Sequence, residues 1–192
     1  YIWMDAEPKW QDIAFTLTET HITTDISMKS VIQRLVNNGK YDFAYKRLKE
    51  YRQKTGSTDY YSIEMGTFFG MRMAYDKALQ EYLLFLETNP QQLQSISDRI
   101  MVYPDLPDIM NAITSILLKS PLQTAQFILA DLHFKQKAYN KGYEILKSNG
   151  APPVMLLNYA KDLVSVNEYM KAEIILTDII NSDANEQMVT KA

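Results

Sequence analysis

Apolar side chains recur at helical spacing along most of the chain. In AYDKALQEYLLFLETNP, from Ala74 to Pro90, apolar residues fall every three or four positions and a proline ends the run. This spacing predicts an amphipathic helix that stops at Pro90, because proline cannot continue a helix. Similar segments rich in Leu, Ile, Ala, Met, Lys, Gln and Glu lie between the scarce glycines and prolines. We therefore expect an all-α protein from about residue 25 onward.

The first 24 residues follow another pattern. The stretch IAFTLTETHITTD, from Ile13 to Asp25, alternates apolar and polar residues and is rich in threonine, as strands often are. Three interpretations stay open: the end of a preceding domain, a β-segment that covers the first helix, or a helix with an unusual pattern. Asp25 precedes the apolar run ISMKSVIQRLV and is a good candidate for a helix N-cap.

The helical pattern repeats. When GKYDFAYKRLKEY is aligned with MAYDKALQEYLLF, Tyr41 falls on Tyr75 and Ala44 falls on Ala78. A similar tyrosine followed three positions later by a small residue recurs at Tyr139 and Tyr169. Three equally spaced prolines give a second, slightly shorter period: Pro90, Pro121 and Pro152. A fixed period of this length predicts repeated pairs of antiparallel helices.

The segment from Asp59 to Pro90 resembles a tetratricopeptide repeat, a helix-turn-helix unit with a period of about 34 residues. Its small and aromatic positions match the pattern of that family, with Ser62 in place of the usual tryptophan: Met65, Gly66, Phe69, Ala78, Tyr82 and Pro90. Weaker units span residues 25–58, 122–151 and 152–183. Residues 91–121 have the length for two helices but lack the Tyr-x-x-Ala element.

The resemblance implies a right-handed superhelical α-solenoid of about five helix-turn-helix units over residues 25–192, preceded by an N-terminal segment, residues 1–24. In this interpretation Gly66 and Ala78 let the helices of one unit approach closely. Tyr75, Tyr82 and Leu86 fill the space between one unit and the next. One unit cannot bury its apolar face alone, so neighbouring units must stack.

The resemblance also implies a binding groove lined by the first helix of each unit, with a protein or peptide as partner. The groove positions carried over to this sequence are Lys29, Gln33, Tyr60, Ile63, Thr67, Asp131 and Lys161. Packing between first helices is an equally good role for Tyr60 and Ile63. Lys29 and Gln33 loosely match a subclass that grips C-terminal carboxylates. Glu64 stands where that subclass has asparagine, and its charge would repel such a ligand.

Composition narrows the classes of function. The net charge of -3 and pI near 5.4 argue against a dedicated nucleic-acid binder. The chain has no cysteine, which excludes disulfides, zinc–thiolate sites and cysteine nucleophiles but fits both a cytoplasmic and an exported, periplasmic location. No apolar run is long enough to predict a membrane span. The segment from Lys40 to Lys54 is basic, with six Lys and Arg residues, and we interpret these charges as a solvated outer face.

Signals of catalysis are weak, and no metal or cofactor is expected. The two histidines, His21 and His133, lie far apart in sequence, and His133 is expected to be a partly exposed helix residue. The G-x-x-x-G spacing in GTFFG, from Gly66 to Gly70, is interpreted as close helix packing. Asp105 and Asp108 flank Pro107, and residues of this type next to proline are expected to cap helices.

The leading hypothesis is therefore a non-catalytic interaction scaffold that binds a partner protein or peptide through the concave face of the repeats. A second hypothesis is an accessory module of a larger enzyme, transporter or secretion component, because the sequence begins at Tyr1 and not at Met. A third is self-assembly as a homo-oligomer, since the final helix contains the apolar run EIILTDII.

Overall fold

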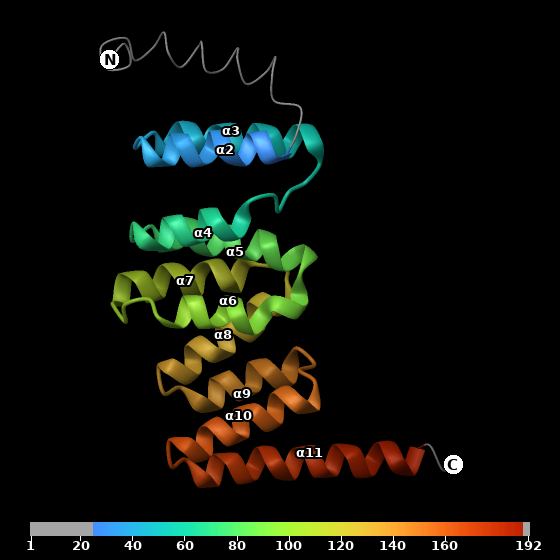
Figure 1. Ribbon diagram of the computed structural model, residues 1–192. Helices are drawn as coiled ribbons and strands as arrows, with labels where there is room; N and C mark the ends of the chain where they lie inside the picture. Colours follow the sequence, from blue (N-terminus) through green and yellow to red (C-terminus); the bar gives the residue numbers. More distant parts are fainter. Residues whose placement is uncertain (1–24, 190–192) are drawn as a thin grey trace, which may run out of the picture. The chain divides into compact units, whose positions relative to one another are not determined.

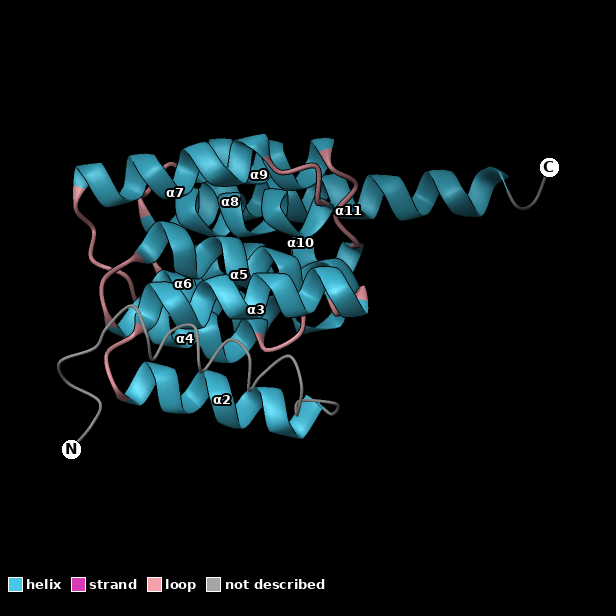
Figure 2. Ribbon diagram, turned by 90° about the horizontal axis from the view of Figure 1, so that it is seen from above, coloured by secondary structure: helices cyan, strands magenta, loops and turns pink. Residues whose placement is uncertain are grey.

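The computed structural model (Figure 1) describes residues 25–189, and the side chains of residues 28–181. Every regular element in this part of the chain is a helix (Figure 2), which confirms the all-α prediction. The strand-like pattern in residues 13–24 lies outside the described residues. The elements are α2 (Asp25–Asn37), α3 (Tyr41–Thr55), α4 (Ser62–Met71), α5 (Tyr75–Thr88), the short 3-10 helix η1 (Pro90–Gln92), α6 (Leu93–Met101), α7 (Pro107–Lys119), α8 (Gln123–Lys135), α9 (Tyr139–Ser148), α10 (Pro153–Ser165) and α11 (Tyr169–Val189).

The chain divides into two compact units at the bond between Tyr61 and Ser62. In the first unit α2 packs against α3. In the second unit α4 packs against α5, α8 against α9, and α10 against α11, so consecutive helices form hairpins (Figure 1). Residues 91–121 contain the two helices expected of them, α6 and α7, and both pack against α8. The prediction of one repeat domain over residues 25–192 stays a prediction.

One turn geometry recurs inside four of the hairpins. Its central residue has φ between 60° and 75°, in the left-handed region: Gly39, Met73, Lys137 and Asn167. In the α8–α9 turn, the Lys137 N–H donates to the Phe134 carbonyl over 2.9 Å, and the Ala138 N–H donates to the His133 carbonyl over 2.8 Å. This is the Schellman arrangement, which satisfies the last carbonyls of a helix. The same two bonds recur in the other three turns.

A tyrosine follows each of these four central residues by two positions and begins the next helix: Tyr41, Tyr75, Tyr139 and Tyr169. The repeated tyrosine of the sequence therefore marks a repeated backbone turn. Residues 102–106 join α6 to α7 without a residue in the left-handed region, which matches the missing Tyr-x-x-Ala element there. The three equally spaced prolines, Pro90, Pro121 and Pro152, all lie where one hairpin ends and the next begins, as predicted.

Two glycines of α4 allow close packing, as the G-x-x-x-G spacing predicted. A methyl group at Gly66 would overlap the Tyr82 ring of α5, with Cδ1 only 2.7 Å away. At Gly70 the same group would lie 3.4 Å from the Tyr103 hydroxyl. The Tyr103 ring in turn packs on Tyr75, with ring centroids 4.4 Å apart, so Tyr75 contacts the loop between α6 and α7, in line with its expected role between one unit and the next.

The basic segment of α3 differs from the prediction of a solvated outer face. Arg47 and Arg52 are each only 6% exposed. Arg47 pairs with Glu50 over 2.8 Å, and the Arg52 Nε donates to the Tyr60 carbonyl over 2.9 Å. The prediction is wrong for these two residues because a guanidinium group can be buried when its donors find acceptors.

The prediction that Asp105 and Asp108 cap helices is also wrong in its detail. The N-cap of α7 is Leu106, and no side chain accepts a capping hydrogen bond there. Pro107 takes the first helical position, where its missing N–H costs nothing. Asp108 lies in the first turn, where a negative charge is favourable because of the helix dipole.

Candidate functional site

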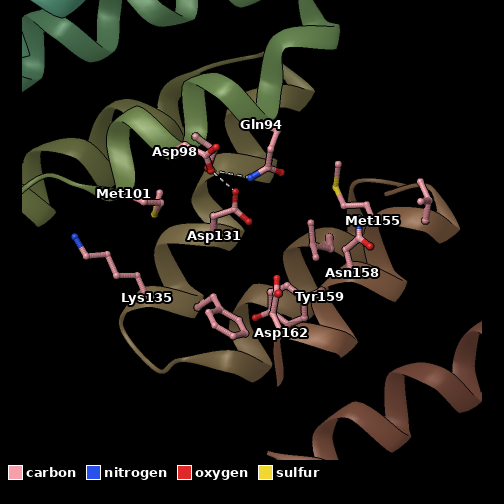
Figure 3. Close-up of a pocket in the computed structure, with 13 residues that line it drawn as sticks. Gln94, Asp98, Met101, Asp131, Lys135, Met155, Asn158, Tyr159 and Asp162 are labelled. Carbon is pink, nitrogen blue, oxygen red and sulfur yellow. Dashed lines mark hydrogen bonds between the residues drawn. The ribbon is translucent and has the colours of Figure 1, made fainter. Parts of the chain in front are cut away.

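The second unit carries a pocket of about 330 Å³ on one face of α6, α8 and α10 (Figure 3). These are the helices that the repeat pattern assigns as the first helix of their units. Polar and apolar side chains both line the pocket. The lining residues are Gln94, Ser97, Asp98 and Met101 of α6, Asp131, Phe134 and Lys135 of α8, Leu146 of α9, and Val154, Met155, Asn158, Tyr159 and Asp162 of α10.

Asp131 is the most buried of the three carboxylates that line the pocket. Its carboxylate accepts a hydrogen bond of 2.5 Å from the hydroxyl of Ser97, a side chain that is only 1% exposed. Burial raises the pKa of Asp131 to about 6, and the nearby carboxylates of Asp162 and Asp98 act in the same direction, while the Ser97 hydrogen bond opposes them. Asp131 is therefore a carboxylate whose charge the pocket stabilises poorly.

Two further carboxylates lie around Asp131. Asp98 accepts a hydrogen bond of 2.9 Å from Gln94, one turn before it on α6. Asp162 of α10 has a pKa raised by burial. Figure 3 shows the three side chains on three different helices around the same space. Among the described residues, no three acidic or histidine side chains are close enough together to hold a metal ion.

Aromatic packing fixes part of the apolar lining. The Phe134 ring meets Tyr159 edge to face, with centroids 5.2 Å apart. The Tyr159 hydroxyl donates to the Tyr139 carbonyl over 2.9 Å, which fixes the orientation of this ring. Met101 and Met155 also line the pocket, and their flexible side chains can adapt to different ligand shapes. The ammonium of Lys135 donates to the backbone carbonyl of Tyr103 over 2.7 Å, and this hydrogen bond fixes its position.

Of the residues predicted to line a groove in the second unit, Asp131 lines the pocket and three others do not. On α4, the Thr67 hydroxyl donates to the Ile63 carbonyl over 2.8 Å and accepts from Arg99 of α6 over 3.0 Å. Ile63 is half-buried, in line with a packing role. Lys161 is exposed on α10 but is not part of the pocket wall.

The other three predicted residues meet in the first unit. The Lys29 ammonium lies 5.9 Å from the ring centroid of Tyr60 and 5.8 Å from that of Tyr61. The Tyr61 hydroxyl donates to Gln33 over 2.9 Å. Lys29, Gln33 and Tyr60 therefore gather around Tyr61, which the sequence reasoning did not single out. Tyr61 has φ of 62°, in the left-handed region. The sequence gives no sign of this, because the position holds neither glycine nor asparagine.

Sequence reasoning also missed Ser97, Asp98 and Asp162. A signal was present, because Asp98, Asp131 and Asp162 recur in the sequence at intervals close to one repeat. His133 is half-buried, as expected, and burial together with the nearby Lys141 lowers its pKa.

No protein-family model, curated protein or solved structure matches the chain. Among the helices of residues 25–189, none is both long enough and apolar enough to cross a membrane.

Proposed function

We propose that this chain is a non-catalytic scaffold that binds a segment of a partner protein in the pocket on α6, α8 and α10. The observation that carries the proposal is the pocket itself, which combines three carboxylates with apolar side chains on the faces of α6, α8 and α10. We further propose that the hairpins form a right-handed solenoid of the tetratricopeptide type, with these helices lining its concave face.

Two features of the hairpins support the tetratricopeptide interpretation. The same Schellman turn recurs at Gly39, Met73, Lys137 and Asn167, each time followed by a helix that begins with tyrosine. Gly66 also lies directly under an aromatic ring of the second helix, which is the role that the small residue of the repeat plays. A repeated unit of this kind creates an extended surface in which each first helix contributes a few side chains.

The chemistry of the pocket favours a peptide that carries lysine or arginine. A long basic side chain places its methylene groups against Met101, Phe134 and Met155 and its charge among the carboxylates. Its cation would also relieve the repulsion between Asp131 and Asp162, which helps to raise the pKa of Asp131. A volume of about 330 Å³ is at the lower end for ligand pockets, so it fits one or two side chains of an extended segment.

The proposal is tested with a random peptide library displayed on phage and selected on the full chain. We expect the recovered peptides to share a lysine or arginine at one position. A synthetic peptide of the recovered sequence should bind the chain, and Asp131→Asn and Asp162→Asn should each weaken binding about tenfold, since each removes a charge that contacts the cation.

The matched control is Asp105→Asn, which removes one negative charge at an exposed position outside the pocket wall. It should leave the affinity of the peptide within about twofold, because exposed charges act weakly at a distance in salt. Equal weakening by Asp105→Asn and Asp131→Asn would mean that only net charge matters. Recovered peptides without a shared basic residue would count against the proposal itself.

A further inference from the structure

The hairpin of α10 and α11 has an apolar face that nothing in the described residues covers. On α11 the stripe consists of Tyr169, Leu176 and Ile180, which are 59%, 37% and 67% exposed. On α10, Leu157 and Val164 are 37% and 44% exposed. We call these five residues the end face. Large apolar side chains gathered in this way on a surface commonly mark an interaction site.

The equivalent residues of the preceding hairpins show how such a stripe is packed elsewhere in the chain. Tyr169 and Leu176 stand at the second and ninth positions after the left-handed residue Asn167 of their turn. The equivalent residues of α9 are Tyr139 and Leu146, which are only 9% and 2% exposed.

In that earlier hairpin the covering element is a helix. α10 packs on α9, and Tyr159 of α10 donates a hydrogen bond to the Tyr139 carbonyl. In α5, the equivalent Tyr75 packs on the ring of Tyr103. Tyr169 and Leu176 therefore stand at positions whose equivalents are contacted by later parts of the chain, but no described residue covers them.

Each half of the end face also contains one exposed charge, and the two charges are opposite. Glu173 lies within the α11 stripe, between Tyr169 and Leu176, at helical spacings of four and three positions. Lys161 lies within the α10 stripe, between Leu157 and Val164, at the same spacings. Residues spaced in this way share one side of a helix.

From this we infer that the end face binds the end face of a second copy of the chain, in a two-fold symmetric dimer. In such a dimer each patch meets itself, and with the two-fold axis along the helices, α10 of one copy lies on α11 of its partner. Lys161 of each copy then faces an oppositely charged Glu173, twice in the dimer, while the apolar residues around them are buried. The face is thus complementary to itself in both charge and hydrophobicity.

A head-to-tail arrangement, with α2 of the next copy on the end face, fits less well. The exposed residues of α2 with described side chains are all polar: Lys29, Ser30, Gln33, Arg34 and Asn37. Such a surface would bury the apolar stripes against groups that need water. The dimer is independent of the peptide pocket, so either proposal can fail without the other.

The experiment measures the mass of the full chain in solution over a range of concentrations by sedimentation velocity. We expect a monomer–dimer equilibrium. Leu176→Glu should raise the dissociation constant by at least about tenfold, because it places a charge in the buried patch twice. The matched control is Met170→Glu, which is on the same helix and 81% exposed but lies outside the end face. It should leave the dissociation constant nearly unchanged.

A charge exchange tests the geometry. Lys161→Glu and Glu173→Lys should each weaken the dimer about tenfold, and the double variant should restore it to within about threefold, since the opposite charges then meet again. A chain that stays monomeric at the highest soluble concentration would overturn the inference. So would a dimer that Leu176→Glu leaves intact, or single charge variants that the double variant does not rescue. Circular dichroism of each variant verifies that the helices are retained.

Discussion

At the scale of single residues, the buried carboxylate of Asp131 lowers the stability of the folded protein when it is ionised. The carboxylate is held near two others, Asp98 and Asp162, and burial raises its pKa to about 6 from a usual 3.8. A group whose charged form is disfavoured lowers the stability of the folded state wherever it is ionised. Residues that reduce stability in this way are more often found at binding sites than in structural cores.

We predict that Asp131→Asn stabilises the protein at neutral pH. Between about pH 4 and pH 6 the folded state binds more protons than the unfolded state, so the wild-type free energy of unfolding should fall as the pH rises through this window. Asparagine has no such titration and can still accept the Ser97 hydrogen bond. The variant should be more stable by about 1–3 kcal/mol at pH 7.5 and about equal to the wild type at pH 3.5.

Urea unfolding at the two pH values, followed by circular dichroism, measures this difference. Asp105→Asn serves as the control, since its side chain is exposed and its replacement should change the unfolding free energy by less than about 0.5 kcal/mol at either pH. If Asp131→Asn instead destabilises the protein at pH 7.5, its carboxylate is part of a stabilising network and not a strained group in a binding pocket.

At the scale of the elements, two of the four repeated turns use residues that are poorly suited to them. Met73 and Lys137 have φ of 60° and 61°, where a side chain of this kind is strained, while Gly39 and Asn167 are residue types that tolerate the equivalent conformation. The hydrogen bonds of the Schellman turn hold these residues in place. The turn itself is therefore favourable, and the strain comes from placing a residue with a side chain at its left-handed position.

We predict that Lys137→Gly stabilises the protein by about 0.5–1 kcal/mol, because the relief of left-handed strain exceeds the added freedom of the unfolded chain. Lys141→Gly provides the matched comparison, since Lys141 lies in the regular part of α9 and should lose about 1 kcal/mol. Thermal unfolding of the two variants gives both values. A loss of stability in Lys137→Gly equal to that in Lys141→Gly would show that Lys137 has no strain to relieve.

The two glycines of α4 give a second prediction at this scale. Gly66→Ala should destabilise the protein by about 1–3 kcal/mol, because its methyl group overlaps the Tyr82 ring. Gly70→Ala should be neutral or stabilising by up to about 1 kcal/mol, since alanine favours the helix and the Tyr103 hydroxyl at 3.4 Å tolerates it. Urea unfolding of both variants compares them. Equal effects would mean that the ring of Tyr82 moves aside freely.

The elements were the part of the structure that sequence predicted best. Local patterns determine where a helix begins and ends. Pro90, Pro121 and Pro152 correctly marked where α5, α7 and α9 end, and the repeated tyrosines marked where the second helix of a hairpin begins. Burial of charge was not predictable in this way. Arg47 and Arg52 were predicted as surface residues. Arg47 pairs with Glu50 on its own helix, whereas the acceptor of Arg52 is the Tyr60 carbonyl, which lies beyond the end of that helix.

At the scale of the whole molecule, the candidate site depends on residues from successive hairpins. Asp131 was predicted from its position in one repeat, but Asp98 and Asp162 become part of the same site only when α6, α8 and α10 lie side by side. The predicted residues Lys29, Gln33 and Tyr60 belong to the other compact unit, where they form a separate cluster. The division at Tyr61 has no compositional signal, because neither glycine nor proline marks it.

Because the Asp131 carboxylate titrates, the binding of a basic peptide by the whole chain should depend on pH. Asp131 is mostly protonated at pH 5 and mostly ionised at pH 7.5. A peptide that contains lysine or arginine but no histidine or acidic residue keeps its own charge over this range. Its affinity should therefore fall about three- to tenfold from pH 7.5 to pH 5, as the carboxylate that faces the cation loses its charge.

Fluorescence anisotropy of the labelled peptide at a series of pH values measures this dependence. The Asp131→Asn variant separates the role of this group from that of the other carboxylates, since it should bind weakly at pH 7.5 and show little change down to pH 5. A wild-type affinity that stays constant across the range would mean that the peptide does not contact Asp131. Parallel profiles for the two proteins would assign the titration to Asp162, whose pKa burial also raises, and would move the cation toward α10.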